Sequence, residues 1–193
     1  MEILGKLLGG QVRVKIMRLF LLNRNKGFFS KDIAKRTRVP ASSVAKEIRL
    51  LSAVGFIKKK NSGWFFDSLF KYTDELEGLL INSDTLDKEV ILNTFKRAGR
   101  LKLLAVSGIF IKAKDSRVDI LLVGDRMKKG KIEEGIKRLE AEIGAELTYA
   151  VFETKEFTYR LNMYDKLVRD ILDFPHEIIF QAKELSTQAL KKV

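Results

Sequence analysis

The chain has 193 residues, of which 46% are hydrophobic, so it can form one large or two small packed cores and is too apolar for a disordered protein. It contains no cysteine, which excludes disulfides and thiolate metal sites. No apolar run is long enough to span a bilayer, and the first ten residues lack the pattern of a signal peptide. We therefore expect a cytoplasmic protein without a membrane partner.

The formal net charge of +12 is concentrated at one end of the chain. Residues 1–70 contain 15 Lys and Arg against 4 Asp and Glu, a net charge of +11, whereas residues 71–193 carry a net charge of only +1. This asymmetry indicates a polyanionic partner for the first third of the chain. Nucleic acid fits best, because its phosphates bind cationic proteins through counterion release. A basic, solvated surface without a partner is the alternative.

The first part of the chain shows the periodicity of short helices followed by a hairpin. Helical spacing of apolar residues predicts three helices, at residues 12–23, 31–36 and 41–53. Pro40 can open the third helix, and Gly55 ends it. Two strands are expected next, at residues 56–60 and 64–66, because Asn61-Ser62-Gly63 between them is a hairpin signal. Phe28-Phe29 can form a very short additional strand.

The third predicted helix has two chemically different faces. The apolar face, expected to pack on the first two helices, consists of Val44, Ile48 and Leu51. The opposite face carries short polar and basic side chains: Ser42, Lys46 and Arg49, with Ser43 at its flank. A helix that reads bases in the major groove needs this arrangement, because Arg and Lys bind guanine acceptors and Ser binds base edges or phosphates. An ordinary amphipathic surface helix is the alternative.

Three consecutive lysines lie on the first strand of the predicted hairpin. Side chains on a strand alternate between its two faces, so Lys58 and Lys60 share one face and Lys59 the other. Because Ile57 is expected to point to the core, Lys59 lies on the same, core-facing side of the strand. Its long side chain should reach from there to solvent. We expect Lys58 and Lys60 to be free for contacts with DNA phosphates.

The segment FFSKDIAKRTRVPASSVAKEIRLLSAVGFIKKK, followed by GWFF, resembles the winged helix-turn-helix of bacterial and archaeal one-domain regulators. The resemblance covers most of residues 10–68 and rests on the apolar pattern of Ile33-Ala34, Val44, Ile48, Leu51 and Gly55-Phe56-Ile57. It implies that the protein binds double-stranded DNA, usually as a homodimer. It does not define the DNA sequence that is bound.

The remainder of the chain predicts an α/β domain after a helical connection. Residues 69–100 are mostly helical in pattern, and their acidic part at residues 69–86 is interpreted as a linker. Strands are then expected at residues 101–106, 118–123, 147–152 and 177–180. A helix is expected at residues 132–143, and residues 157–172 are expected to be helical in two pieces. Strands that alternate with helices are typical of α/β domains. Residues 181–193 are expected to form a helical or frayed tail.

The segments LLAVSGIFIKAKDSRVDILLVGD and AELTYAVFETKEFTYRL resemble the minimal nucleotidyltransferase fold, over roughly residues 87–182. In active members, a Gly-Ser loop holds the nucleotide, and an Asp-x-Asp pair with a third carboxylate holds Mg²⁺. Here the loop reads Ser107-Gly108, Arg117 stands at the first Asp position, and only Asp119 is left. The third carboxylate position reads Leu147-Thr148-Tyr149. The resemblance therefore implies a domain without catalytic residues, metal or cofactor.

Two uses of such a domain are open. It can sense a small ligand in the former nucleotide cleft, whose expected lining is Ser107, Gly108, Arg117 and Asp119. It can instead mediate dimerisation or dock a protein partner, which we favour because no residue selects a ligand. Asp119 is then expected to be structural, paired with Arg117 or Lys112.

The sequence as a whole predicts an α+β protein with an N-terminal winged helix-turn-helix at residues 1–68, a helical linker at 69–86 and a nucleotidyltransferase-like α/β domain at 87–193. The expected function is that of a non-enzymatic, sequence-specific transcriptional regulator, with DNA and a small-molecule or protein effector as partners. One alternative is a Mg²⁺-dependent nucleotidyltransferase whose winged helix positions an RNA or protein substrate. Another is an architectural protein that binds nucleic acid without sequence preference.

Overall fold

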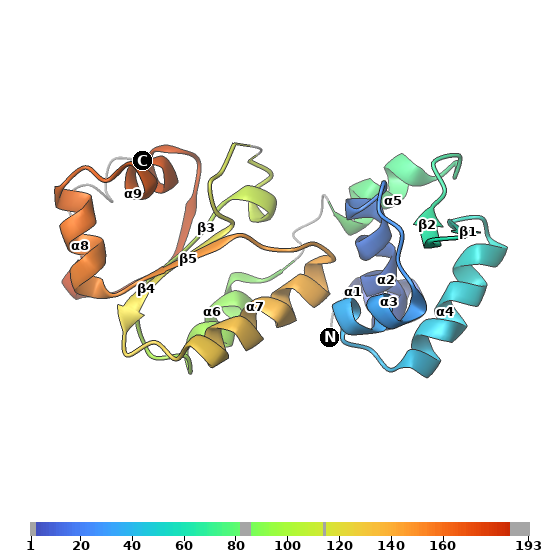
Figure 1. Ribbon diagram of the computed structural model, residues 1–193, viewed down its shortest axis with the longest axis horizontal. Coiled ribbons are helices and arrows are strands. Elements are labelled where there is room, and N and C mark those ends of the chain that lie inside the picture. Colours follow the sequence, from blue (N-terminus) through green and yellow to red (C-terminus); the bar gives the residue numbers. More distant parts are fainter. Residues whose placement is uncertain (1–2, 82–85, 114, 186–193) are drawn as a thin grey trace. The chain divides into compact units, whose positions relative to one another are not determined.

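The computed structural model describes residues 3–81, 86–113 and 115–185 (Figure 1). It contains both helices and small β-sheets, as expected for an α+β protein. The chain forms two compact units. The first comprises Met1–Leu86 and Lys137–Glu146, and the second comprises Asp87–Ile136 and Leu147–Val193. Across the described ranges, every helix is too short or too polar to cross a bilayer.

The first unit consists of helices followed by a two-stranded hairpin. Its elements in chain order are α1 (Ile3–Leu7), α2 (Gln11–Leu22), α3 (Ser30–Thr37), α4 (Ala41–Ala53), β1 (Ile57–Lys60), β2 (Gly63–Phe66) and α5 (Thr73–Leu80). The predictions for α2, α3, α4 and the two strands are confirmed, and α4 has the predicted bounds. The prediction of a short strand at Phe28 is confirmed as an isolated antiparallel bridge between Phe28 and Trp64. Helix α1 was not predicted.

The core of the first unit is built on α2. Ile16 and Phe20 of α2 are fully buried, and the Phe20 ring meets the edge of the Phe28 ring at a centroid distance of 5.7 Å. Leu80 of α5 is buried in the same hydrophobic cluster. Part of the segment interpreted as a linker, residues 69–86, is therefore packed in the first unit. The second unit begins at Asp87, where the boundary was expected, but Lys137–Glu146 is grouped with the first unit instead of the second.

The second unit contains a four-stranded mixed sheet with the strand order β5-β4-β3-β6. Its elements in chain order are α6 (Lys88–Phe95), β3 (Arg100–Val106), the 3₁₀ turn η1 (Gly108–Phe110), β4 (Ile120–Asp125), the first part of α7 (Lys129–Ile143), β5 (Tyr149–Phe152), α8 (Thr154–Asn162), α9 (Lys166–Asp173), β6 (Glu177–Gln181) and the 3₁₀ turn η2 (Lys183–Leu185). From Lys137 onward, α7 is grouped with the first unit. The predicted strands are confirmed, although β4 and β5 each begin two residues later than expected. Of the predicted tail, residues 186–193 lie outside the described residues.

Strand β4 is the centre of this sheet. It pairs antiparallel with β3 and parallel with β5, and β3 pairs antiparallel with β6. Ile120 to Gly124 are all buried, as expected for a strand that is covered on both faces of its sheet. The crossover from β4 to β5 runs through α7, whose Ile132, Ile136, Leu139 and Ile143 are buried as the periodicity predicted. Strands β4 and β5 therefore end at the same edge of the sheet.

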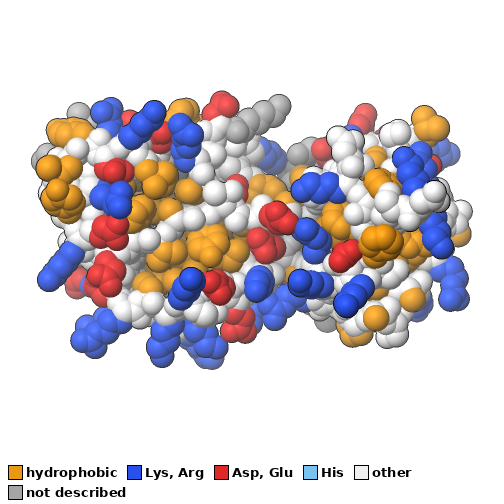
Figure 2. Space-filling view, in the orientation of Figure 1, with side chains coloured by type: hydrophobic (Ala, Val, Ile, Leu, Met, Phe, Trp, Pro, Cys, Tyr) orange, Lys and Arg blue, Asp and Glu red, His pale blue; other side chains and the backbone are white. Residues whose placement is uncertain are grey.

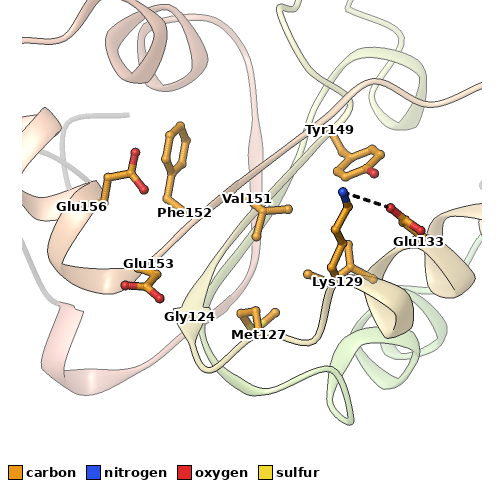
Figure 3. A pocket seen from close by; sticks show the side chains of 10 residues that line it. Gly124, Met127, Lys129, Glu133, Tyr149, Val151, Phe152, Glu153 and Glu156 are labelled. Atoms are coloured by element: carbon orange, nitrogen blue, oxygen red, sulfur yellow. Dashed lines mark ion pairs between the residues drawn. The ribbon is translucent and has the colours of Figure 1, made fainter.

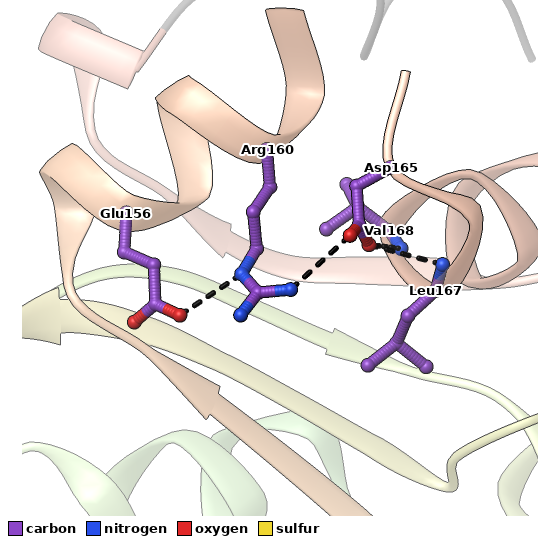
Figure 4. Close-up of polar contacts among 5 residues, drawn as sticks. All are labelled: Glu156, Arg160, Asp165, Leu167 and Val168. Carbon is purple, nitrogen blue, oxygen red and sulfur yellow. Dashed lines mark hydrogen bonds and ion pairs between the residues drawn. The ribbon is translucent and has the colours of Figure 1, made fainter. Parts of the chain in front are cut away.

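The corner between α8 and α9 is held by a small polar network (Figure 4). The guanidinium of Arg160 donates to Glu156 at 2.9 Å and to Asp165 at 3.1 Å. The hydrogen bond from Arg160 to Glu156 is the main reason why the pKa of Arg160 is raised. Asp165 also caps α9, because its Oδ1 accepts the backbone N–H groups of Leu167 and Val168. One carboxylate thus starts α9 and connects it to α8.

Candidate nucleic-acid interface

Helix α4 presents the predicted polar face to solvent. Val44, Ile48 and Leu51 are buried on one side of the helix, as expected. Ser42, Lys46 and Arg49 are exposed on the other side, and Ser43 is half-buried at its flank. Neither Lys46 nor Arg49 forms an ion pair with any other residue that the structure describes. The two cations are therefore available to an external anion.

The orientation of α4 is fixed by a charged pair that the sequence did not reveal. Glu47 lies between Val44 and Ile48 on the buried face, and its Oε2 accepts Arg13 Nε of α2 at 2.7 Å. Arg13 also donates to the carbonyl of Leu8 at 2.9 Å. A carboxylate on an apolar helix face was the available signal for such a pair, because buried charges need a partner. The pair links α4 directly to α2.

The turn between α3 and α4 is tight. Thr37 Oγ1 is buried and donates to the carbonyl of Ile33 at 2.6 Å. Arg38 follows with a φ of 55°, and its backbone N–H bonds to Ala34 O. This left-handed conformation is usual for glycine and uncommon for arginine. This conformation ends α3. The Arg38 side chain is exposed, and Pro40, two residues later, is the N-cap residue of α4.

The side chains of the hairpin lie on the faces that strand alternation predicts. Lys58 pairs with Phe65 across the strands and Lys59 with Trp64, so Lys59 is on the side of Ile57. The ammonium of Lys59 lies 5.9 Å from the centre of the Trp64 ring. The ammonium of Lys60 lies 4.9 Å from the centre of the Phe65 ring on the other face.

The expectation that Lys58 is free for phosphate is wrong. Its Nζ forms an ion pair with Asp67 Oδ1 at 2.7 Å, and the side chain is 39% exposed. The hydrogen bond from Lys58, together with that from the Leu69 backbone, lowers the pKa of Asp67. Asp67 follows β2 and comes beside Lys58 only when the hairpin closes, so strand alternation alone could not reveal the partner. Lys60 is exposed, as expected.

A basic groove of 590 Å³ runs along the outer side of the hairpin. Its cations are Arg24, Lys58, Lys60 and Lys71, and its aromatic lining is Phe65, Phe66 and Phe70. The guanidinium of Arg24 lies 5.5 Å from the centre of the Phe66 ring and pairs with Glu77 at 2.6 Å. Arg24 and Lys58 are paired with Glu77 and Asp67, so the cations that the groove offers to a phosphate are Lys60 and Lys71, with Asp74 as the carboxylate in its lining.

The polar groups of the residues predicted to line a ligand cleft in the second unit are largely bonded to neighbouring groups of the protein. Ser107 Oγ donates to the carbonyl of Val118, and the backbone N–H of Gly108 donates to Ser116 Oγ at 3.0 Å. The carboxylate of Asp119 accepts two backbone N–H groups, from Ile109 at 3.0 Å and from Thr148 at 2.8 Å.

Arg117 does not pair with Asp119, contrary to one expectation. Its Nε bonds to Asp170 Oδ2 of α9 at 3.0 Å. Asp119 thus has the structural role expected of it, but through backbone N–H groups. Ser107, Gly108 and Asp119 come together, whereas the Arg117 side chain is directed to α9. Within the described ranges, no three His, Cys, Asp or Glu side chains are grouped to hold a metal ion.

Comparisons with known proteins do not assign the chain. It matches no protein-family model, no curated protein and no solved structure. The function is therefore argued from the chemistry of the residues described above.

Proposed function

We propose that the first unit is a winged helix-turn-helix that binds double-stranded DNA, and that the protein is a sequence-specific transcriptional regulator. One observation carries the proposal: Ser42, Lys46 and Arg49 form an exposed face on a helix whose opposite face is buried in the core. A recognition helix must be held rigidly from behind while its polar side chains reach base edges. Val44, Ile48 and the Arg13–Glu47 pair provide that support for α4.

The chemistry of α4 suits the major groove. Lys or Arg can donate to the O6 and N7 acceptors of guanine, and Ser can bind a base edge or a phosphate. In the proposed complex, Lys46 and Arg49 contact base edges. Ser42 and Ser43, in the first turn of α4, bind a base edge or a phosphate. The net charge of +11 over residues 1–70 supports the proposal, because it supplies the attraction to phosphates that sequence reading requires.

The hairpin acts as the wing in this proposal. Lys60 is its main phosphate contact, since it is exposed and lacks a carboxylate partner among the described residues. Lys59 contributes from the other face. Phosphate contacts of this kind fix the register of a protein on DNA without carrying sequence information.

We also propose that the second unit is a nucleotidyltransferase-like module without transferase activity, which serves as an effector or dimerisation domain. Two observations support this assignment. The carboxylate of Asp119 is used to hold two backbone N–H groups. Arg117, which stands where a metal ligand is expected, has only donors and cannot coordinate Mg²⁺.

Selection of bound sequences from a random DNA pool, followed by footprinting, tests the proposal. We expect enrichment of one motif and protection of a defined site, with two-fold symmetry if the protein binds as a dimer. Equal binding to every sequence would instead indicate an architectural role. Absence of DNA binding at low salt would contradict the proposal as a whole.

A further inference from the structure

We propose that the second unit binds a small organic amine, with its ammonium group at the rim and an aromatic or branched apolar body inside a cavity beside β5. The cavity has a volume of 340 Å³ and lies along β5 and the end of β4, beside the helices that follow these strands, α7 and α8 (Figure 3). This volume is in the range of small-molecule sites. The inference does not depend on DNA binding by the first unit.

The position of the cavity follows from the sheet topology. The parallel strands β4 and β5 end at the same edge, where the chain leaves them for α7 and α8. The carboxyl ends of adjacent parallel strands are the usual place for ligands in α/β sheets. Strand β5 is the outermost strand of the sheet, so within the described residues no further strand pairs with its free side.

The interior of the cavity is apolar. Met127, Ile132, Val151 and Phe152 line it, and Tyr149 lies at one end with 37% of its surface exposed. Figure 2 shows hydrophobic side chains gathered on the face of the second unit where Figure 1 has β5 and α7. A ligand with an apolar body would remove this surface from water, which favours binding in proportion to the area buried.

The charged groups at the rim select a cation. Three carboxylates line the cavity, from Glu133, Glu153 and Glu156, against one cation, Lys129. This local excess of negative charge stands out in a chain with a net charge of +12. A ligand carboxylate or phosphate would meet repulsion here, whereas an ammonium group would gain charge-assisted hydrogen bonds.

The three carboxylates are not equally available to a ligand. Glu156 is held by Arg160, which lies outside the cavity lining. Glu133 is 3.9 Å from the ammonium of Lys129, a side chain that is 91% exposed, so water screens this pair strongly. Glu153 has no ion-pair partner among the residues that the structure describes. Glu153 is therefore the main carboxylate that binds the ammonium group of the ligand, and Glu133 is the second.

This cavity is separate from the cleft predicted by the sequence. Asp119 comes directly before the first residue of β4, whereas Gly124 is near its last residue. None of the four residues predicted for the cleft lines the cavity, although Tyr149 at one end of the cavity pairs with Ile120, the residue after Asp119. The polar groups of the first are already bonded within the protein, and the apolar surface of the second is open.

The inference is tested by NMR titration of the full-length protein with 2-phenylethylamine and with 2-phenylethanol, its neutral isostere. We expect saturable shifts in the backbone amides of Gly124, Val151 and Glu153 with the amine. The alcohol should bind about tenfold more weakly, since it lacks the charge-assisted hydrogen bond to Glu153. Equal affinity for the two compounds, or an absence of shifts at these amides, would overturn the proposal.

Variants separate charge recognition from general effects. Glu153→Gln should weaken binding of the amine about tenfold and leave binding of the alcohol unchanged. Glu133→Gln should have a smaller effect in the same direction. Glu89→Gln is the matched control, because Glu89 is exposed on α6 and is not part of the cavity lining. If Glu153→Gln binds the amine as the parent does, the cation site is wrong, whatever the result of the DNA experiments.

Discussion

A side chain on residue 108 and the carboxylate of Asp119 compete for the same space. A Cβ at Gly108 would overlap Asp119 Oδ1, and Gly108 also has a φ of +55°, which other residues adopt at a cost. We predict that Gly108→Ala destabilises the second unit by about 2–4 kcal/mol, through strain and overpacking together. Hydrogen exchange of the buried Leu121 amide measures this loss without interference from the first unit.

The same pair provides its own control. Asp119→Ala removes the atom with which the new methyl group collides. The cost of Gly108→Ala should therefore be smaller in the Asp119→Ala background, and a double-mutant cycle gives the difference. An equal cost in both backgrounds would show that the positive φ, rather than Asp119, requires glycine.

The exposed face of α4 should determine sequence preference. Lys46→Ala or Arg49→Ala should reduce the difference in binding free energy between the selected site and a scrambled site by about 1–3 kcal/mol. Folding should be little changed, because exposed cations contribute little to stability. Competition binding assays measure the discrimination.

Ile48→Ala serves as the contrasting variant on the opposite face of α4. Ile48 is 5% exposed, so its truncation should destabilise the first unit by about 2–5 kcal/mol and reduce binding to every sequence alike. If Lys46→Ala and Arg49→Ala discriminate between sites as the parent does, α4 is not the reading helix.

The wing lysines should differ in their effect on salt dependence. Lys60→Ala should reduce the slope of log affinity against log salt concentration by nearly 0.9, the value for one lost phosphate contact. Lys58→Ala removes the partner of Asp67 and adds an uncompensated negative charge near the groove. The double variant Lys58→Ala with Asp67→Asn restores the local charge and should bind nearly as the parent. A Lys60→Ala variant with an unchanged slope would show that Lys60 does not contact a phosphate.

The Lys58–Asp67 pair also predicts a titration. The pKa of Asp67 is lowered from 3.8 by the hydrogen bond from Lys58 and then by that from the Leu69 backbone. A depressed pKa in the folded state stabilises the fold above the ordinary pKa, and this contribution is lost as the pH falls through the folded-state pKa. Carboxyl-detected NMR should give a midpoint below 3.8 in the parent and a higher one in Lys58→Ala. The same midpoint in both proteins would contradict the ion pair.

Asp165 should be important for the stability of α9. Asp165→Ala removes both the helix cap and the partner of Arg160, and should destabilise the second unit by about 0.5–2 kcal/mol. Asp165→Asn keeps a capping oxygen and should cost less. Hydrogen exchange of the Ile171 amide, which lies inside α9 and away from the cap, compares the two variants. Equal losses would assign the effect to the charge rather than to the cap.

Local signals made part of this fold predictable. Pro40 and Gly55 mark both ends of α4, and the two faces of the helix follow from its period, so its bounds and exposed residues were predicted correctly. Strand alternation likewise gave the sides of the hairpin on which Lys59 and Lys60 lie.

Contacts between residues distant in sequence were not predictable in this way. Arg18 belongs to a helix with a correct prediction, yet its side chain is fully buried and donates to Leu80 O, 62 residues away. The pairs Arg13–Glu47 and Lys58–Asp67 also depend on how separate elements pack. Periodicity tells which face of an element is inside, but it does not name the partner that a buried or half-buried charge meets there.

Trp64 is the only tryptophan of the chain, and it lies in β2 of the hairpin. Two backbone hydrogen bonds of 2.9 Å join it to Phe28, and the Lys59 ammonium is 5.9 Å from its ring. Its fluorescence therefore reports on a single location, which belongs to the first unit. Unfolding of that unit, or displacement of Lys59 toward a phosphate, can be followed optically in the unlabelled protein while the second unit stays silent.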